Sequence, residues 1–158
     1  MKLLILSDTH GNYPLAIKAI EQAGQVDQIV HLGDDMEDAF IIERIIGQPV
    51  IKVPGNCDFA AKVPRELCKS IAQKNILLTH GDKYNVKAGL AQLRKKALAE
   101  RAHIVLYGHS HLAAIETIEE ILFINPGCLH RSSTKPTYAT LNLVSGEVSA
   151  EIIPVHGP

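Results

Sequence analysis

The sequence contains no tryptophan and only three cysteines, Cys57, Cys68 and Cys128. An odd number of cysteines at irregular spacing, with no Cys-X-X-Cys pair, argues against a disulfide scaffold and against a thiolate zinc site. The pattern favours a reducing compartment instead. We therefore expect the protein in the cytoplasm.

Long hydrophobic runs are also missing. The apolar stretch Leu3–Leu6 is too short for the core of a signal peptide and leads almost directly into Asp8. No segment approaches the ~20 apolar residues that a membrane-spanning helix needs. We expect no targeting segment and no association with a membrane.

Neither sign of charge dominates. Sixteen lysines and arginines stand against seventeen aspartates and glutamates, which gives a formal net charge of -1. A protein that binds extended nucleic acid through a broad basic surface carries an excess of positive charge. Extended nucleic-acid binding is therefore disfavoured, while a small focused site for phosphate stays compatible with this balance.

The residues that are present are typical of a globular domain. Hydrophobic residues make up 46% of the 158 residues. A chain of this length buries roughly two thirds of its unfolded surface, so its core needs no disulfide and no structural metal. No repeat or linker interrupts the sequence, and we expect one domain over residues 1–158.

Apolar runs and amphipathic segments alternate in the first half, which predicts βαβ units and a largely parallel sheet. The predicted elements there are strands at 2–7, 28–32 and 50–53 and helices at 14–23 and 36–46. The second half predicts one helix, at 86–101, among strands at 65–71, 75–79, 104–107, 113–118, 121–124, 138–144 and 148–153. The fold class is therefore α/β, of the mixed α+β kind, with only strands beyond residue 108.

Five of these apolar strands end in polar residues that can bind metals. The segments are Ser7-Asp8-Thr9-His10, Gly33-Asp34-Asp35, Gly55-Asn56-Cys57-Asp58, His80-Gly81-Asp82 and Gly108-His109-Ser110-His111. Each segment alone is more often a turn or a structural histidine than a site. Ligands collect at the carboxyl ends of parallel strands, so the five ends together predict one shared site.

The donors at these strand ends are two carboxylates, one amide oxygen and four imidazoles, which is too many for a single ion. Four imidazoles suit borderline divalent ions such as Mn, Fe, Co, Ni or Zn better than Mg or Ca. Two such ions ~3.5–4 Å apart can activate a water between them and neutralise phosphoryl oxygens during in-line attack. A carboxylate must bridge the pair, and Asp34 is our choice.

In this order, the segments resemble the pattern of the calcineurin-like metallophosphoesterase superfamily: Asp-X-His, Gly-Asp, Gly-Asn, His and Gly-His-X-His. The resemblance covers residues 3–127. The stretches 7–12, 55–58 and 125–127 narrow it to the small bacterial and archaeal phosphodiesterases of the YfcE type. That subfamily is itself similar to the small phosphoesterase-like subunit of eukaryotic retromer.

The resemblance implies a four-layer αββα sandwich with mixed sheets and a dinuclear site at one end. Carried over by position, Asp8, His10 and His111 would hold the first metal, Asn56, His80 and His109 the second, and Asp34 would bridge them. It implies hydrolysis of a small phosphate ester, most simply a phosphodiester, by in-line attack of a metal-bridging hydroxide. Mn is the expected metal, with Ni, Fe, Zn or Co as alternatives. The expected catalytic residues are Asn56, Cys57 and His80.

Cys57 departs from the wider superfamily, whose larger members have a histidine there that contacts phosphate and protonates the leaving group. A free thiol has a pKa of ~8.5, and nearby cations lower it. Beside two dications Cys57 would lean towards thiolate, a poor proton donor. The hypothesis is faster turnover of esters with acidic leaving groups such as nitrophenol. The alternative is that Cys57 packs as a small apolar residue.

Residues around the ligands have less specific signals. Asp58 is expected to orient a ligand imidazole through its distal nitrogen, and Asp35 to cap the helix that follows it. Asn12 is a candidate donor to a phosphate oxygen, and Arg131 is either a phosphate clamp or an exposed loop arginine. The histidines expected outside the site are His31, His103, His130 and His156.

Three questions stay open at this level. A phosphomonoesterase would use the same site, because its donors recognise any phosphoryl group. A non-catalytic scaffold for protein interaction, like the retromer subunit, is the alternative from another class, and the intact ligand set argues against it. A homo-oligomer is compatible with the strand-rich C-terminal part, which could leave an edge strand free to pair.

Overall fold

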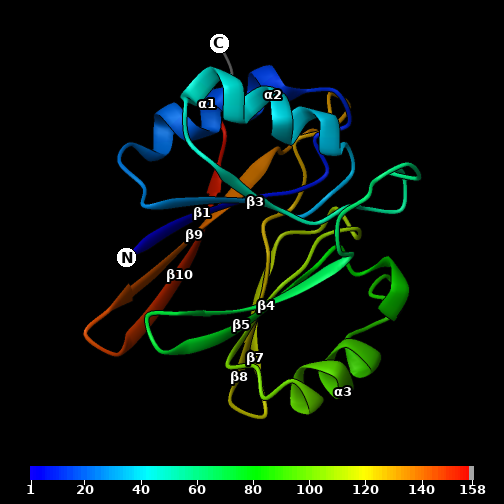
Figure 1. Ribbon diagram of the computed structural model, residues 1–158, viewed down its shortest axis with the longest axis vertical. Helices are drawn as coiled ribbons and strands as arrows, with labels where there is room; N and C mark the ends of the chain where they lie inside the picture. The colour runs from blue at the N-terminus through cyan, green and yellow to red at the C-terminus, as the bar shows by residue number, and fades with distance from the viewer. Residues whose placement is uncertain (157–158) are drawn as a thin grey trace.

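Two five-stranded sheets face each other in this computed structural model, which describes residues 1–156. Helices α1 (Tyr13–Ala23) and α2 (Met36–Ile46) cover the outer face of the first sheet, and α3 (Ala91–Ala99) covers the outer face of the second (Figure 1). The predicted four-layer αββα sandwich is therefore confirmed.

The first sheet has the strand order β10-β9-β1-β2-β3. Its parallel strands are β1 (Lys2–Leu6), β2 (Gln28–His31) and β3 (Val50–Lys52), as the alternation in the first half predicts. Strand β9 (Thr137–Val144) pairs antiparallel with β1, and the edge strand β10 (Glu147–Pro154) pairs antiparallel with β9.

The second sheet has the strand order β4-β5-β6-β8-β7 and is also mixed. Its parallel strands are β5 (Lys74–Thr79), β6 (Ile104–Leu106) and β8 (Ile121–Asn125). The antiparallel edge strands are β4 (Glu66–Ile71) and β7 (Ala114–Ile118).

The main core lies between the two sheets and draws on both of them. Leu3, Ile5 and Val30 of the first sheet share one buried cluster with Leu78 and Leu106 of the second. The outer faces of the sheets form two further clusters with the helices. Burial of apolar surface on both faces explains why the central strands are continuous apolar runs.

Local signals set the ends of α2. The Asp35 side chain accepts a hydrogen bond of 3.3 Å from the backbone N–H of Glu37, so the predicted helix cap is confirmed. Gly47 ends the helix in the left-handed conformation, with φ at 69°.

The third helix is shorter than the predicted 86–101. Gly89 has φ at 138°, which no helix contains, and a hydrogen bond from Ala88 N–H to the Asn85 carbonyl forms a turn before it. A short 3-10 helix, η1 (Asp82–Tyr84), precedes these turns, and Val86 packs against Gly81. The apolar spacing of 86–90 therefore reflects turn packing rather than helix.

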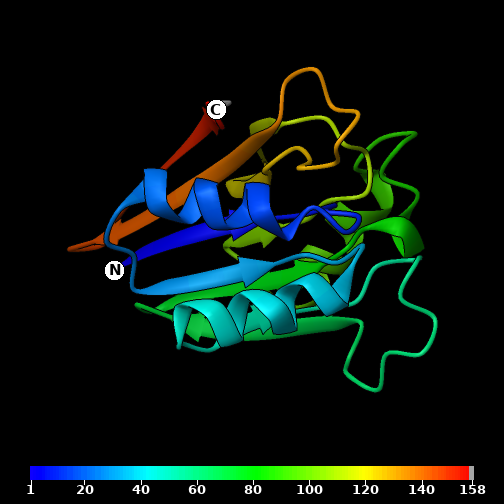
Figure 2. The same ribbon diagram turned by 90° about the horizontal axis from the view of Figure 1, so that it is seen from above.

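The loops that follow β1, β2, β3, β5 and β6 lie at the same end of the sandwich (Figure 2). The parallel strands of each sheet direct their carboxyl ends there, as the sequence predicts. Among the described residues, no helix is long and apolar enough to cross a membrane.

Candidate metal centre

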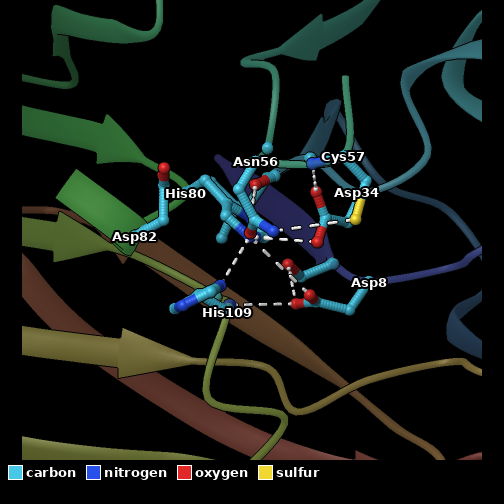
Figure 3. Close-up of polar contacts among 12 residues, drawn as sticks. Asp8, Asp34, Asn56, Cys57, His80, Asp82 and His109 are labelled. Carbon is cyan, nitrogen blue, oxygen red and sulfur yellow. Dashed lines mark hydrogen bonds and ion pairs between the residues drawn. The ribbon is translucent and has the colours of Figure 1, made fainter. Parts of the chain in front are cut away.

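The carboxylates of Asp8 and Asp34 lie at the centre of this loop cluster (Figure 3). Asp8 is fully buried and Asp34 is 3% exposed. The donor atoms of the histidines gather around them in two groups, and Asn56 joins the second. All seven predicted ligands are thus brought to one place.

The first donor group consists of Asp8, His10 and His111. His111 Nε2 lies 3.1 Å from Asp8 Oδ1, and His10 Nε2 lies 3.9 Å from the same oxygen. Asp8 Oδ2 accepts hydrogen bonds from the Ser7 hydroxyl, at 2.5 Å, and from the His109 backbone N–H, at 3.1 Å. The second oxygen of Asp8 is therefore fixed while the first faces the histidines.

The second donor group consists of Asp34, His80 and His109, with Asn56 beside them. His80 Nε2 lies 3.4 Å from Asp34 Oδ2, 3.1 Å from Asn56 Oδ1 and 3.2 Å from His109 Nδ1. The other ring nitrogen of His80 hydrogen-bonds the carbonyl of Leu32 at 2.8 Å. This contact holds the buried ring with Nε2 towards the centre.

Each donor group combines residues from both sheets. In the first group, Asp8 and His10 follow β1 of the first sheet and His111 follows β6 of the second. In the second group, Asp34 follows β2, whereas His80 and His109 follow β5 and β6. The centre therefore spans the gap between the sheets.

The backbone is strained at five of the seven predicted ligand residues. Asp8, His10, Asp34, His109 and His111 all have positive φ, between 45° and 66°. Non-glycine residues rarely adopt this conformation, which costs of order 1–3 kcal/mol per residue and occurs mainly at functional sites. Each of these five residues supplies a donor atom to one of the two groups.

Two glycines allow the chain to pass close to the carboxylates. A Cβ at Gly55 would collide with the Asp34 side chain, and one at Gly108 would collide with the Ser7 hydroxyl and approach Asp8 Oδ2 to 2.8 Å. Both positions need glycine because there is no space for a Cβ. Neither glycine has a positive φ, so the backbone conformation is not the reason.

Two buried donor atoms test whether the residues fit a metal. Asp8 Oδ1 and His10 Nε2 are both buried and make no hydrogen bond among the described residues, and the neighbours of Asp8 Oδ1 are other donor atoms, with His111 Nε2 at 3.1 Å. Burial of a polar atom that makes no hydrogen bond costs free energy. A cation bound by this atom and the donor atoms around it would remove that cost. The oxygen and imidazole donors suit a borderline divalent ion.

The same residues shift one another's proton affinity. Burial would raise the pKa of Asp34, but hydrogen bonds from His80 and the Cys57 backbone hold it well below its usual range. Burial would also raise the pKa of Asp8, but the contact with His111 and the charge of His80 lower it on balance. Both carboxylates are therefore ionised at neutral pH, the state in which they bind cations.

Asp58 supports the centre through the backbone rather than through a histidine. Its carboxylate accepts hydrogen bonds from the backbone N–H groups of Asp34 (3.0 Å), Met36 (2.8 Å) and Gly55 (2.7 Å). The prediction that Asp58 orients a ligand imidazole is wrong in this respect. Its contacts instead join the loops that carry Asp34 and Asn56.

His31 joins the two turns that carry the carboxylates. It is fully buried, with Nε2 3.0 Å from the Thr9 hydroxyl and Nδ1 accepting from the Gly33 N–H at 3.2 Å. Because Nδ1 accepts, Nε2 carries the proton and donates to Thr9. This agrees with the structural role expected for His31.

Cys57 lies at the edge of the second donor group. Its backbone N–H donates to Asp34 Oδ1 at 2.8 Å, and its exposed Sγ lies within 4.8 Å of donor atoms of Asp34 and His10. Burial and the charge of Asp34 raise the pKa of the Cys57 thiol to about 11. The nearby carboxylates thus raise the pKa of this thiol, whereas two bound dications would lower it.

The two candidate phosphate contacts have different surroundings. The Asn12 amide donates to the Leu129 carbonyl at 2.7 Å, which ties the turn after β1 to the segment after β8. Arg131 is exposed in the loop that follows. Asn12 therefore has a clear structural contact, and Arg131 stays a prediction.

Two nearby residues have no signal in the sequence. The sequence predicts His130 outside the site, whereas its ring packs edge-to-face against His10 with centroids 5.0 Å apart. Arg65 donates to the Gly55 carbonyl and to Asp82 Oδ2, both at 3.2 Å, and so joins two of the loops. His130 lies far along the chain from His10, whereas Arg65 lies 10 and 17 positions from Gly55 and Asp82.

Comparison with known proteins identifies relatives along most of the chain. A family model described as the calcineurin-like phosphoesterase superfamily domain matches residues 1–146. The probable metallophosphoesterase YsnB of Bacillus subtilis is 34% identical over 146 residues, covering 90% of this chain and 85% of that protein. Phosphodiesterase YfcE of Escherichia coli is 28% identical over 80% of this chain and 78% of its own length.

Solved structures agree in fold. A predicted phosphoesterase from Streptococcus pneumoniae superposes with a TM-score of 0.79 at 25% identity, covering 97% of this chain and 88% of that one. Vps29 of Entamoeba histolytica, solved with zinc, gives a TM-score of 0.74 at 18% identity over 99% of this chain and all of that one. The Vps29 likeness is one of fold.

The buried carboxylates, the converging histidines and the extent of the family match lead to one assignment. This chain is a member of the calcineurin-like phosphoesterase superfamily, of the small YfcE type, whose members are metal-dependent phosphoesterases.

Proposed function

We propose that this protein is a phosphodiesterase that works with two divalent metal ions, with Mn as the first candidate. Asp8, His10 and His111 would hold one ion, and Asn56, His80 and His109 the other. Asp34 would serve both, because its Oδ2 lies 3.9 Å from His10 Nε2 and 3.4 Å from His80 Nε2. Two divalent ions supply a nucleophilic water at neutral pH and neutralise charge on the phosphoryl oxygens.

The observation that carries this proposal is the pair of buried atoms without partners, Asp8 Oδ1 and His10 Nε2. A scaffold that had lost its metal would gain stability by replacing these atoms with apolar ones. Instead the chain keeps them together with strained backbone at the same residues. Retention of such costs favours a working centre.

The protein's own side chains prepare the site for phosphate. His80 is fixed by the Leu32 carbonyl, so its Nε2 has one orientation. Asn56 and Cys57 lie on the loop after β3, beside Asp34, and with His80 are the proposed catalytic residues. The exposed thiol of Cys57 would contact the leaving group, and the three free cysteines suit a reducing cytoplasm.

The test is hydrolysis of bis(p-nitrophenyl) phosphate and p-nitrophenyl phosphate by chelated protein, before and after addition of Mn, Ni, Zn or Mg singly. We expect activity with Mn or Ni, a higher rate on the diester, and two metal ions per chain by elemental analysis. Asp34→Asn should lower the rate about 10³-fold, because several kcal/mol of transition-state stabilisation by metal depends on its charge.

Three other outcomes would change the assignment. A higher rate on the monoester would favour a phosphomonoesterase with the same ligands. One ion per chain at full activity would contradict the dinuclear site. No hydrolysis of either ester with any metal would favour the scaffold.

A further inference from the structure

A pocket of about 530 Å³ opens beside the metal centre, between α2 and the loop after β3. Its apolar lining includes Met36 and Phe40 of α2 and Phe59, Ala60 and Val63 of the loop. The volume lies in the range of small-molecule sites, which are mostly apolar with a few polar groups. The pocket is distinct from the cluster of metal donors but shares a border with it.

Cys57 forms that border. It lines the pocket, and its Sγ also lies within 4.8 Å of donor atoms of Asp34 and His10. Asp35 and Asp58, which also line the pocket, each neighbour a residue of the centre in the chain. Figure 3 shows the Cys57 sulfur beside Asp34. A group covalently attached to a phosphate at the centre therefore has the pocket next to it.

Two aromatic rings define the pocket chemically. Phe59 is 93% exposed, although a large apolar side chain gains by leaving water. Phe40 is 42% exposed, and Lys52 Nζ lies 4.7 Å from its ring centroid. Lys52 is itself held by Glu43 at 2.5 Å, which helps to fix the ring. One pocket wall is thus prearranged and the other presents an uncovered ring.

The charges around the pocket restrict what it can bind. Its acidic residues are Asp35, Glu37 and Asp58, against one basic residue, Lys62. An organic group that carries further phosphates would be repelled by this excess of negative charge. An uncharged flat ring would stack on the phenylalanines.

We propose that this pocket binds the organic group of the substrate, and that this group is aromatic and carries no further negative charge. The inference rests on the proposed phosphoesterase function and specifies its substrate class. Phe40 and Phe59 would determine specificity, while the metal ligands hold the phosphoryl end. Long polyanions are poor substrates on this account.

The test compares phenylphosphonate with methylphosphonate, which have the same phosphoryl group and a P–C bond that ester hydrolysis leaves intact. Binding to the Mn-loaded protein is measured by isothermal titration calorimetry. We expect phenylphosphonate to bind about tenfold more tightly, equivalent to about 1.4 kcal/mol. In Phe40→Ala and in Phe59→Ala that preference should fall to about threefold or less, with methylphosphonate binding unchanged.

Leu98→Ala is the matched control, because it removes an exposed apolar side chain from α3, on the opposite layer. It should keep the full preference. Phe59 is so exposed that its truncation cannot unfold the protein, so Phe59→Ala remains decisive if Phe40→Ala is unstable.

Equal binding of the two phosphonates, or a preference that survives both substitutions, would overturn the pocket assignment. So would the absence of binding by either phosphonate in a protein that hydrolyses the diester, and the proposed function would then stand. A phenyl preference that depends on Phe59 in a protein inactive on every ester would support the pocket and refute the phosphoesterase assignment.

Discussion

The two donor groups of the centre are alike in composition and different in how the fold supports them. In the Asp34 group, His80 is 1% exposed and contacts Leu32, Asn56 and His109. In the Asp8 group, the side chains of His10 and His111 are 23% and 41% exposed, and two buried atoms have no partner.

This difference indicates two ways to prepare a metal site. Internal hydrogen bonds arrange the Asp34 group before a metal arrives, and an ion must displace some of them. In the Asp8 group, whose histidines are more exposed, the two buried atoms without hydrogen bonds gain most from an ion. We infer that the stability of the Asp8 group depends on bound metal more than that of the Asp34 group does.

The largest expected effect comes from substituting one histidine of each group. His80→Asn should lower the unfolding free energy of chelated protein by about 1–3 kcal/mol, because the buried Leu32 carbonyl loses its partner. His111→Asn should change it by less than about 1 kcal/mol, since its pair with Asp8 is partly exposed. Both variants should lose most diester hydrolysis.

Urea unfolding with chelator present measures the first quantity, and the rate with Mn measures the second. Equal losses of stability in the two variants would remove the distinction between the groups.

A second prediction tests His31, which contacts the turns of both groups. Burial lowers the pKa of His31 to about 4, against the opposing charges of Asp8 and Asp58. Between about pH 6.5 and 4 the unfolded chain binds a proton that folded His31 does not, so stability falls as pH falls through this window. The loss amounts to about 3 kcal/mol at most.

His31→Gln lacks this titration while keeping a neutral polar side chain. The difference in unfolding free energy between native protein and variant, followed with urea from pH 7 to 4.5, should shrink as pH falls. A difference independent of pH would show that His31 does not stay neutral in the folded protein.

The smallest expected effect concerns Cys57, at the edge of the Asp34 group. Cys57→His should raise the rate on dialkyl phosphates relative to diaryl phosphates by about tenfold, because an imidazolium protonates an alkoxide leaving group. Cys57→Ser is the control and should leave the ratio near its native value. No gain in the histidine variant would mean that Cys57 serves packing alone.

The sequence predicts where these donor residues gather, because they follow strands that are clearly apolar in the sequence. Asp8, Asp34 and His80 each come directly after a buried run, and parallel pairing of the strands brings their carboxyl ends to the same edge. The Asp35 cap is predictable for a similar reason, since its hydrogen bond is made within two residues.

The failures share a different cause. His130 reaches His10 only through the long return of the chain after β8, and Arg65 contacts Asp82 across two loops. Asp58 accepts hydrogen bonds from backbone N–H groups, which do not depend on residue type, so no sequence motif indicates these contacts. The start of α3 depends on the φ of one glycine, Gly89, that apolar periodicity does not reveal.

Each donor group takes ligands from both sheets, which otherwise touch mainly through apolar side chains. A bound ion would therefore act as a cross-link between two layers that hydrophobic contacts alone would let slide. The affinity for metal and the packing of the two sheets against each other would then depend on one another. A change in the packing of the core between the sheets, to which Ile5 and Leu106 contribute, would change how tightly the protein retains a metal ion.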